Sequence, residues 1–315
     1  MPPLTSPSSP ELEAPREPVN RKTLKADHPT WCPGCGDFAV LSSFYRTLEQ
    51  LQLPHERIVT LAGIGCSSRF PYFVNTHGGH FLHGRSVPFA SGVSLGRDDL
   101  HVFVFGGDGD GFSIGGNHLD HGARKNVNLT YVIMDNFVYG LTKKQTSPTS
   151  PIGFRSKTDP TGSFDRPINP MKKLLNSGAT FVARSHATQV KHMVEMYERA
   201  IKHRGFSVIE ILSECVEFYP GAFDAGIPRK GGTFNLIEEK RHDGTTEDET
   251  RHDVRDEMAA FKLASLEWPG VFGVFYENER PTKNDLEANL VRQSRDRAGN
   301  AGDVELLEAA FARMK

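Results

Sequence analysis

The chain is poor in cysteine: its 315 residues include only four, at Cys32, Cys35, Cys66 and Cys215. So few thiols exclude a disulfide-rich secreted scaffold and predict reduced cysteines in a cytoplasmic protein. Long apolar runs are also missing, since none approaches the ~18 residues that a membrane-spanning helix requires. We therefore expect no membrane association.

The chain also carries no large excess of charge. Its 37 Lys and Arg residues nearly balance 39 Asp and Glu residues, which gives a formal net charge of −2. This balance argues against general binding of nucleic acid, so we expect no nucleic-acid partner. Hydrophobic residues make up 37% of the sequence, enough for the core of one large or two small domains.

The first part of the chain, Met1–Asn20, is rich in Pro, Ser and Glu and contains no apolar segment. This composition predicts a disordered tail rather than a signal peptide. We expect residues 21–230 to form a binding domain and residues 231–315 to form a C-terminal extension. Two interpretations of the extension remain open: an arm that docks a partner, or a cover for the sheet.

Beyond the tail, helical and strand-like patterns alternate, which favours an α/β fold with a parallel sheet flanked by helices. Asp37 is expected to cap a helix that runs to about Leu51, and Ala187–His203 is expected to form another helix. Four apolar runs have the pattern of buried strands: Ile58–Ala62, Val102–Phe105, Leu129–Met134 and Ser207–Leu212.

Several later segments have weaker patterns. Leu141–Asn169 is a long polar stretch, and loops of this length are usually functional or disordered. Gly231–Asp253 has the composition of a solvated connector. After it we expect one helical segment, a short strand near Gly270–Tyr276 and a terminal helix from about Val304.

Two glycine-rich motifs directly follow neighbouring strand-like runs. Gly107-Asp108-Gly109 follows the first run, and Asn136 follows the second, with room for one crossover helix between them. In such a right-handed unit the two strands are parallel and their carboxyl ends lie at one edge, so Asp108 and Asn136 are expected to be adjacent. Carboxylate and amide oxygens are hard ligands, suited to Mg²⁺ holding a diphosphate.

Other interpretations of the first motif are weaker. A calcium-binding EF-hand loop starting at Asp108 would need ligands or glycine where Phe112, Ser113 and Leu119 stand. A dinucleotide-binding fingerprint fails because its third glycine would fall on Phe112 or Ile114. An ordinary turn stays an alternative, since Gly and Asp are common turn residues.

The four cysteines can converge on one centre. Cys32 and Cys35 flank a Pro-Gly turn, whereas Cys66 and Cys215 each follow a strand-like run. If those runs join the same parallel sheet, all four thiols lie beside the diphosphate site. Spacing alone leaves both a structural zinc ion and a [4Fe-4S] cluster open.

The ordered combination of motifs resembles the beta subunit of 2-oxoacid:ferredoxin oxidoreductases of the two-subunit type. The resemblance covers roughly residues 25–225. Its motifs are His28–Asp37, Gly63–Phe73, His83–Arg85, Gly107–Asp110, Asp135–Thr142, Gln145–Thr149 and Glu210–Cys215. Asp135, Lys143, Lys144 and Glu214 depart from the residues common in relatives, but none of these departures removes a ligand.

The resemblance implies three cofactors. Thiamine diphosphate would be held through Mg²⁺ bound by Asp108, Asn136 and the carbonyl of Val138, and the four cysteines would bind a [4Fe-4S] cluster. The cluster is favoured over zinc because a cluster beside thiamine diphosphate can accept electrons, whereas a zinc ion cannot. The cofactor-binding residues implied are Gly65, Ser67, Ser68, Gly107, Asp108, Gly109, Asp110, Asn136, Val138, Tyr139, Gly140, Leu141 and Thr142.

The resemblance also implies an activity. The enzyme would oxidatively decarboxylate a 2-oxoacid, transfer the acyl group to coenzyme A and pass electrons to ferredoxin, and it could run backward as a reductive carboxylase. The resemblance favours 2-oxoglutarate as the substrate, with pyruvate and branched-chain 2-oxoacids as alternatives. Two interpretations from other classes stay open: a non-redox thiamine decarboxylase or synthase component with zinc, and a zinc-stabilised binding module.

The motifs of the chain account for only the diphosphate half of a thiamine enzyme. An alpha subunit is therefore expected to supply the pyrimidine-binding domain with its activating glutamate, in a heterodimer or a dimer of heterodimers. His83 and Arg69 are candidate catalytic residues: histidine suits proton transfer near neutral pH, and Arg69 could pair with a substrate carboxylate. A structural role is about equally consistent with either residue. Arg85 is a further candidate for contact with cofactor or substrate.

Overall fold

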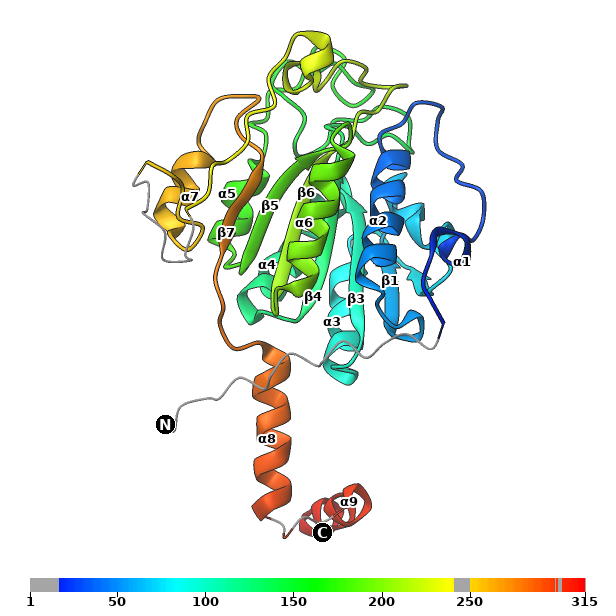
Figure 1. The fold of residues 1–315 in the computed structure, drawn as a ribbon, viewed down its shortest axis with the longest axis vertical. Helices are drawn as coiled ribbons and strands as arrows, with labels where there is room; N and C mark the ends of the chain where they lie inside the picture. The colour runs from blue at the N-terminus through cyan, green and yellow to red at the C-terminus, as the bar shows by residue number, and fades with distance from the viewer. Residues whose placement is uncertain (1–16, 241–249, 298, 300–301, 315) are drawn as a thin grey trace.

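The computed structural model describes residues 17–240, 250–297, 299 and 302–314. Within these residues, one seven-stranded sheet in the order β2-β1-β3-β4-β6-β5-β7 lies between two layers of helices (Figure 1). The strands are β1 Ile58–Ala62, β2 His77–His80, β3 His101–Gly107, β4 Leu129–Asp135, β5 Phe181–His186, β6 Phe206–Leu212 and β7 Gly273–Glu277.

The first six strands run parallel, so the predicted parallel α/β sheet is confirmed. β3 and β4 are adjacent, with Phe103 opposite Thr130 and Gly107 opposite Met134. The helix α4, Gly116–Lys125, forms the expected crossover between them. β7 differs from the expectation because it pairs antiparallel with β5.

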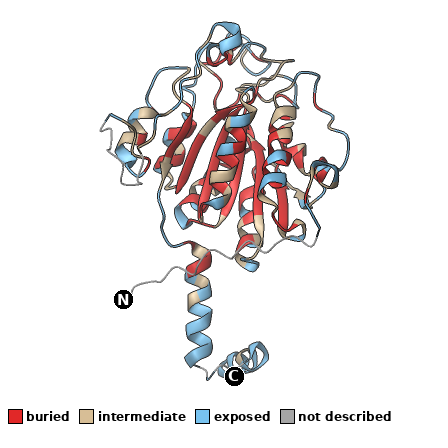
Figure 2. Ribbon diagram, in the orientation of Figure 1, coloured by how far each residue is buried: buried red, intermediate tan, exposed pale blue. Residues whose placement is uncertain are grey.

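Side chains that alternate along the strands point into two apolar cores, one on each face of the sheet. Phe103 and Phe105 pack on one face with α2, Asp37–Leu51, and α6, Val190–Lys202. Val102 and Val104 point to the other face, which is covered by four helices. These are α3 Ser86–Gly96, α4, α5 Pro170–Asn176 and α7 Glu257–Leu263. Figure 2 shows the buried strands between helices whose outer sides are exposed, the arrangement that period-2 alternation predicts.

The predicted strands at 58–62, 102–105, 129–134 and 207–212 are all present, and each differs from its observed strand by two residues at most. The helix beginning at Asp37 is also present, but the predicted cap is wrong. Gly36 occupies the cap position, and the Asp37 carboxylate instead accepts a hydrogen bond from the Ser213 hydroxyl at 2.6 Å. Burial, opposed by that bond, raises the pKa of Asp37 to about 6.

Several boundaries differ from the expectations. α6 begins three residues after the predicted start, and 141–169 contains neither helix nor strand, as expected of a loop. Residues 1–16 of the predicted tail and 241–249 of the predicted connector lie outside the described residues. The first helix, α1, Arg21–Leu24, begins at residue 21, but Val19 is buried and Asn20 caps the helix, so contacts with the folded body begin within the predicted tail.

The C-terminal part contains a helix that the sequence pattern did not predict. α8, Lys283–Arg297, leaves the body at the lower end of the sheet in Figure 1, and α9, Asp303–Arg313, follows it close to the predicted start. Among the described residues, no helix is both long enough and apolar enough to cross a membrane.

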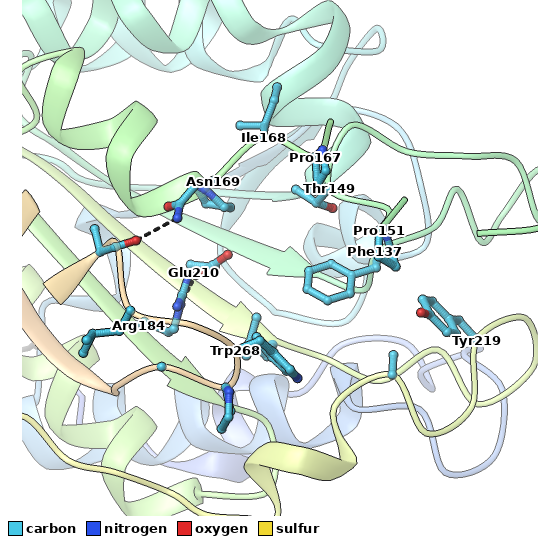
Figure 3. A pocket seen from close by; sticks show the side chains of 17 residues that line it. Phe137, Thr149, Pro151, Pro167, Ile168, Asn169, Arg184, Glu210, Tyr219 and Trp268 are labelled. Carbon is cyan, nitrogen blue, oxygen red and sulfur yellow. Dashed lines mark hydrogen bonds and ion pairs between the residues drawn. The ribbon is translucent and has the colours of Figure 1, made fainter. Parts of the chain in front are cut away.

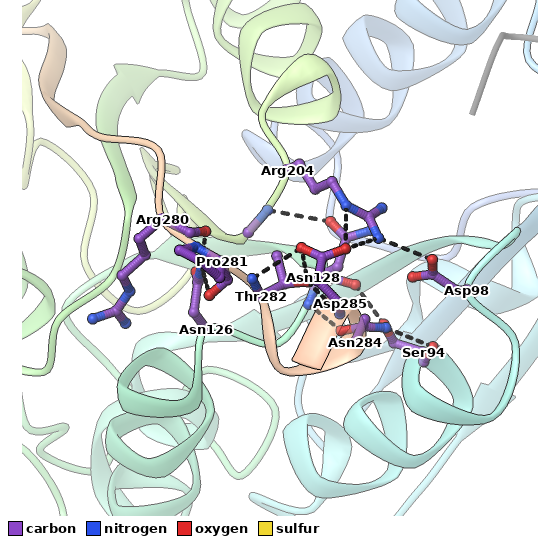
Figure 4. A network of polar contacts seen from close by, with 11 residues as sticks. Ser94, Asp98, Asn126, Asn128, Arg204, Arg280, Pro281, Thr282, Asn284 and Asp285 are labelled. Carbon is purple, nitrogen blue, oxygen red and sulfur yellow. Dashed lines mark hydrogen bonds and ion pairs between the residues drawn. The ribbon is translucent and has the colours of Figure 1, made fainter. Parts of the chain in front are cut away.

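A polar network fixes the start of α8 (Figure 4). Asp285 accepts hydrogen bonds from Arg204 at 2.6 Å and from the Thr282 hydroxyl at 2.7 Å. Asn284 donates to the carbonyl of Ser94 at 2.8 Å, and its own side-chain oxygen accepts from the backbone of Asn128. Because these side chains are buried at the junction, the direction of α8 is set by hydrogen bonds rather than by apolar packing.

Candidate functional site

A cavity of about 160 Å³ lies at the carboxyl edge of β1, β3 and β4. Fourteen of its fifteen lining residues come from three strand-end segments. Those segments contribute Ile64, Gly65, Cys66 and Ser67 after β1, Gly107, Asp108, Gly109 and Asp110 at the end of β3, and Asn136, Val138, Tyr139, Gly140, Leu141 and Thr142 after β4, with His83 completing the wall. The predicted strand–helix–strand geometry therefore brings Asp108 and Asn136 to one cavity.

Asp108 is held by two hydroxyl groups of the long loop. Ser147 Oγ and Thr149 Oγ1 donate to its Oδ2 at 2.5 and 2.6 Å. The Asp108 side chain is almost fully buried, and burial raises its pKa although these hydrogen bonds oppose the shift. A divalent cation would supply the positive charge that this buried carboxylate lacks.

Asn136 lies in a tight turn that follows β4. Its side-chain oxygen accepts from the backbone N–H of Val138 at 3.1 Å, which fixes the amide beside the Val138 carbonyl group. Phe137 between them has φ of 59°, a conformation that non-glycine residues rarely adopt. Ser150 Oγ donates to the Phe137 carbonyl at 2.7 Å and so stabilises this turn.

Gly109 allows a close approach between the two motifs. A Cβ atom at this position would lie 2.0 Å from Tyr139 Cε1, so a side chain here would force the aromatic ring to move. Gly109 begins a π-helical turn, Gly109–Ile114, that leads into α4. Such turns recur at functional sites because they redirect backbone groups within a helix.

His83 and Asp110 form a hydrogen-bonded pair at the rim of the cavity. His83 Nδ1 lies 2.9 Å from Asp110 Oδ1, which also accepts from the backbone of Ile64 and Gly84. The hydrogen bond to Asp110 is the largest influence on His83 and raises its pKa. Asp110 therefore joins three segments of the wall, and a histidine that readily carries a proton faces the cavity.

The four cysteines are gathered by contacts between their segments. The Trp31 indole donates to the Cys66 carbonyl at 2.7 Å, and the Gly36 backbone donates to the Glu214 carbonyl at 3.4 Å. A Cβ atom on Gly140 would lie 3.6 Å from the sulfurs of both Cys66 and Cys215. Among the described residues, no three His, Cys, Asp or Glu side chains are close enough to hold a single metal ion.

Burial dominates the chemistry of these thiols. It raises the pKa of Cys35, and it raises the pKa of Cys66 to about 12, with the nearby Asp37 carboxylate as the second cause in both cases. The pKa of Cys215 is also raised by burial, although backbone N–H groups of residues 217–219 point at its sulfur and oppose the shift. A bound cation or cluster would stabilise the thiolates.

Some predicted residues lie outside the cavity. The Arg69 guanidinium donates weakly to the Thr30 carbonyl at 3.4 Å, near the cysteines, and Arg69 does not line the cavity. Ser68 is buried behind the wall with no hydrogen-bond partner for its hydroxyl. Sequence reasoning named the segment Gln145–Thr149 but missed the specific contacts of Ser147 and Thr149, because only the folded loop brings them to Asp108.

A second cavity of about 550 Å³ lies on the other side of the Phe137 turn (Figure 3). The ion pair between Arg184 and Glu210 borders it, and both side chains are largely buried. Thr149 lines this cavity and also lies 2.9 Å from Asp135 Oδ1. Burial, with Asp108 and Glu210 nearby, raises the pKa of Asp135 well above its usual value.

The comparisons with known proteins agree with this geometry. The family described as thiamine pyrophosphate enzyme, C-terminal TPP binding domain, matches residues 63–211. The 2-oxoglutarate oxidoreductase subunit KorB of Mycobacterium tuberculosis is 38% identical, and the alignment covers 90% of this chain and 84% of the relative. The 2-oxoacid:ferredoxin oxidoreductase subunit beta of Saccharolobus solfataricus is also 38% identical, over 81% of this chain and 84% of the relative.

A solved structure gives the same result. A chain of 2-oxoglutarate:ferredoxin oxidoreductase from Magnetococcus marinus, with 2-oxoglutarate, coenzyme A and succinyl-CoA bound, has a TM-score of 0.82 and 38% identity. The match covers 95% of this chain and 99% of that chain. Sequence identity at this level over nearly the whole length means that the chain belongs to the family of 2-oxoacid:ferredoxin oxidoreductase beta subunits.

Proposed function

We propose that this chain is the beta subunit of a thiamine diphosphate-dependent 2-oxoglutarate:ferredoxin oxidoreductase. The reaction is the oxidative decarboxylation of 2-oxoglutarate with transfer of the acyl group to coenzyme A, and it is reversible when ferredoxin is sufficiently reduced. Relatives named for 2-oxoglutarate and the solved neighbour bound to 2-oxoglutarate support this substrate. Pyruvate and branched-chain 2-oxoacids are the alternatives, since other relatives are named only for 2-oxoacids.

The observation that carries the proposal is the shared cavity of Asp108 and Asn136 at neighbouring strand ends. The donor set fits the cofactor: a buried carboxylate, an amide oxygen and the Val138 carbonyl group are oxygen ligands that suit Mg²⁺. Because Gly107 and Gly109 carry no side chain, the Ser67 hydroxyl and the Tyr139 ring pack directly against this turn and complete the cavity wall. When bound, thiamine diphosphate supplies the electron sink that decarboxylation of a 2-oxoacid needs.

The residues of the chain have separate roles in this proposal. Asp108, Asn136 and Val138 hold the cation, and the glycine turns admit the diphosphate. Ser67, Tyr139 and Leu141 line the same wall and exclude water from the bound group. The His83 side chain carries or accepts a proton at Nε2, because its Nδ1 is engaged by Asp110.

We also assign the four cysteines to a [4Fe-4S] cluster. The fit rests on the approach of Cys66 and Cys215 to Gly140, a residue of the cavity wall, and on the contacts that tie the Cys32–Cys35 turn to both. The backbone N–H groups that point at the Cys215 sulfur would stabilise its thiolate. A structural zinc ion is the competing occupant, and with it the chain would be a component of a non-redox thiamine enzyme.

The partners follow from the same proposal. The relatives' designation as beta subunits implies an alpha subunit, and we assign to it the pyrimidine-binding domain. The remaining partners are ferredoxin, the 2-oxoacid and coenzyme A, in a heterodimer or a dimer of heterodimers. Reduced thiols and a soluble electron carrier fit a cytoplasmic enzyme.

The test is iron and acid-labile sulfide content on anaerobically purified complex, followed by reduction of ferredoxin on addition of 2-oxoglutarate and coenzyme A. We expect about four irons and four sulfides per beta chain, and reduction that requires both substrates. Stoichiometric zinc without iron would overturn the cluster assignment. Reduction with pyruvate but not with 2-oxoglutarate would overturn the substrate assignment.

A further inference from the structure

Three hydroxyl groups in one short segment contact both turns that carry the proposed cation ligands. We name Ser147, Thr149 and Ser150 the hydroxyl clamp. We propose that the clamp positions the Mg²⁺ ligands and thereby sets the affinity and selectivity of the site for the cation. This inference rests on the proposed binding of Mg²⁺ and thiamine diphosphate.

The first half of the clamp fixes the carboxylate after β3. The hydroxyls of Ser147 and Thr149 converge on one oxygen of Asp108, Oδ2, at 2.5 and 2.6 Å. All three side chains are at most 5% exposed, so water does not replace these bonds. Two donors satisfy Oδ2 and fix the rotation of the carboxylate, which leaves Oδ1 for the cation.

The second half of the clamp fixes the turn after β4. Ser150 Oγ donates to the carbonyl of Phe137 at 2.7 Å and accepts from the backbone N–H of Ser147 at 2.8 Å. The Phe137 backbone has the unfavourable φ of 59°, so the turn needs outside contacts to persist. The hydrogen bond to its carbonyl holds the two proposed ligands on either side, Asn136 and Val138, in their relative positions.

The two halves act as one unit. Ser147 Oγ lies 3.3 Å from Thr149 Oγ1 and 3.2 Å from Ser150 Oγ, so the Ser147 hydroxyl contacts both of the others. Pro148 stands between the first two and restricts the backbone of the segment. One segment of four residues therefore determines the distance between ligands that come from two different strands.

Fixed ligand positions have a consequence for metal choice. Mg²⁺ demands near-ideal octahedral geometry at short distances, whereas Ca²⁺ accepts longer and less regular coordination. Loosening the clamp is therefore expected to weaken Mg²⁺ binding more than Ca²⁺ binding. Loss of partners that orient metal ligands typically costs roughly 10–100-fold in metal affinity.

The experiment uses the complex of both subunits, stripped of cation and cofactor and then supplied with thiamine diphosphate. Binding of Mn²⁺ is measured from the electron paramagnetic resonance signal of the free ion, and Mg²⁺ and Ca²⁺ are ranked by displacement of Mn²⁺. For Ser147→Ala and Thr149→Val we expect roughly 10–100-fold weaker Mg²⁺ binding and a smaller preference for Mg²⁺ over Ca²⁺. For Thr149→Ser, which keeps the hydroxyl, we expect binding close to that of the wild type.

Ser156→Ala is the matched control. Ser156 belongs to the same loop and is similarly buried, but its hydroxyl contacts Thr146 and Thr158 rather than a ligand-bearing turn. Ser150→Ala is the second test, because it removes a contact to the Phe137 carbonyl without changing a contact to a ligand side chain. This variant keeps the inference testable if Ser147→Ala and Thr149→Val do not fold.

The outcomes are distinct. If folded Ser147→Ala, Thr149→Val and Ser150→Ala proteins bind and rank the three cations as Ser156→Ala does, the clamp has no positioning role and the inference is wrong. If the wild type itself binds no Mn²⁺ in the presence of thiamine diphosphate, the proposed cofactor site is wrong and this inference falls with it.

Discussion

At the scale of single residues, Gly109 is the position where the site leaves least room for a side chain. In Gly109→Ala the new Cβ would meet the Tyr139 ring at 2.0 Å, so we expect the ring to be displaced toward the cavity. The expected result is at least roughly tenfold weaker binding of thiamine diphosphate, because a misplaced wall residue removes contacts with the diphosphate. Calorimetric titration of the stripped complex with thiamine diphosphate and Mg²⁺ measures this effect.

Gly92→Ala is the control for this substitution. Gly92 lies within α3, and a Cβ there meets nothing within 4 Å, so the variant should bind the cofactor normally and gain up to about 1 kcal/mol of helix stability. Normal cofactor affinity in a folded Gly109→Ala protein would contradict the assignment of this turn to the diphosphate.

The adjacency of Asp108 and Asn136 was predictable from the sequence, for a physical reason. Asp108 and Asn136 each follow a recognisable strand, and parallel topology alone brings strand ends together. Arg69 was chosen because it can pair with a carboxylate and Ser68 because it belongs to the motif around Cys66, but both lie in the turn Ser67–Tyr72 and neither lines the cavity. The clamp hydroxyls could not be located because the loop that carries them has no periodic pattern. The individual site assignments remain predictions.

At the scale of secondary structure, Asp285 is the residue that anchors α8. We expect Asp285→Ala to lower the free energy of unfolding by about 2 kcal/mol, because the substitution leaves the Arg204 guanidinium and the Thr282 hydroxyl without their buried acceptor. Urea unfolding of wild type and variant measures the difference. If the Asp285→Ala protein is as stable as the wild type, the contacts of Asp285 shown in Figure 4 do not contribute to the free energy of unfolding.

The same anchor has a predicted pH dependence. Burial alone would raise the pKa of Asp285, but hydrogen bonds from Arg204 and Thr282 outweigh burial and lower it. A carboxyl group with a lowered pKa in the folded state stabilises the protein above its unfolded pKa of about 3.9 and loses this effect as pH falls through the folded value. The stability difference between wild type and Asp285→Ala should therefore shrink in acid.

Long buried strands were predictable because β1, β3, β4 and β6 consist mainly of apolar residues, many of them β-branched or aromatic. α8 was missed because its apolar residues do not form a continuous stripe and most of its surface faces solvent. The short strand β2, with the sequence His-Gly-Gly-His, has no residue type that favours a strand, and only its pairing with β1 makes it one. Tertiary contacts, rather than local preference, determine these elements.

At the scale of the whole molecule, the cavity that contains Asp108 and Asn136 opens beside exposed apolar side chains. Leu82, Ile114 and Leu141 are 77%, 51% and 46% exposed. Leu141 lines the cavity, Leu82 precedes the lining residue His83, and Ile114 lies against Gly84. A group of this kind is typical of a surface that a partner covers. We therefore predict that the isolated chain has no detectable oxidoreductase turnover and that addition of the alpha subunit restores it, as measured by ferredoxin reduction. Full turnover by the chain alone would refute the need for a partner.

The antiparallel direction of β7 has a practical consequence. Because β7 runs against its neighbours, the chain leaves the sheet at the edge opposite the cavity, and the 15 residues of α8 extend roughly 22 Å farther. The carboxyl ends of the parallel strands, where the cavity lies, and this helix are thus at opposite ends of the sheet (Figure 1). The exposed surface of α8 is therefore a suitable attachment point for immobilising the subunit on a surface, with the cavity left free to face solution.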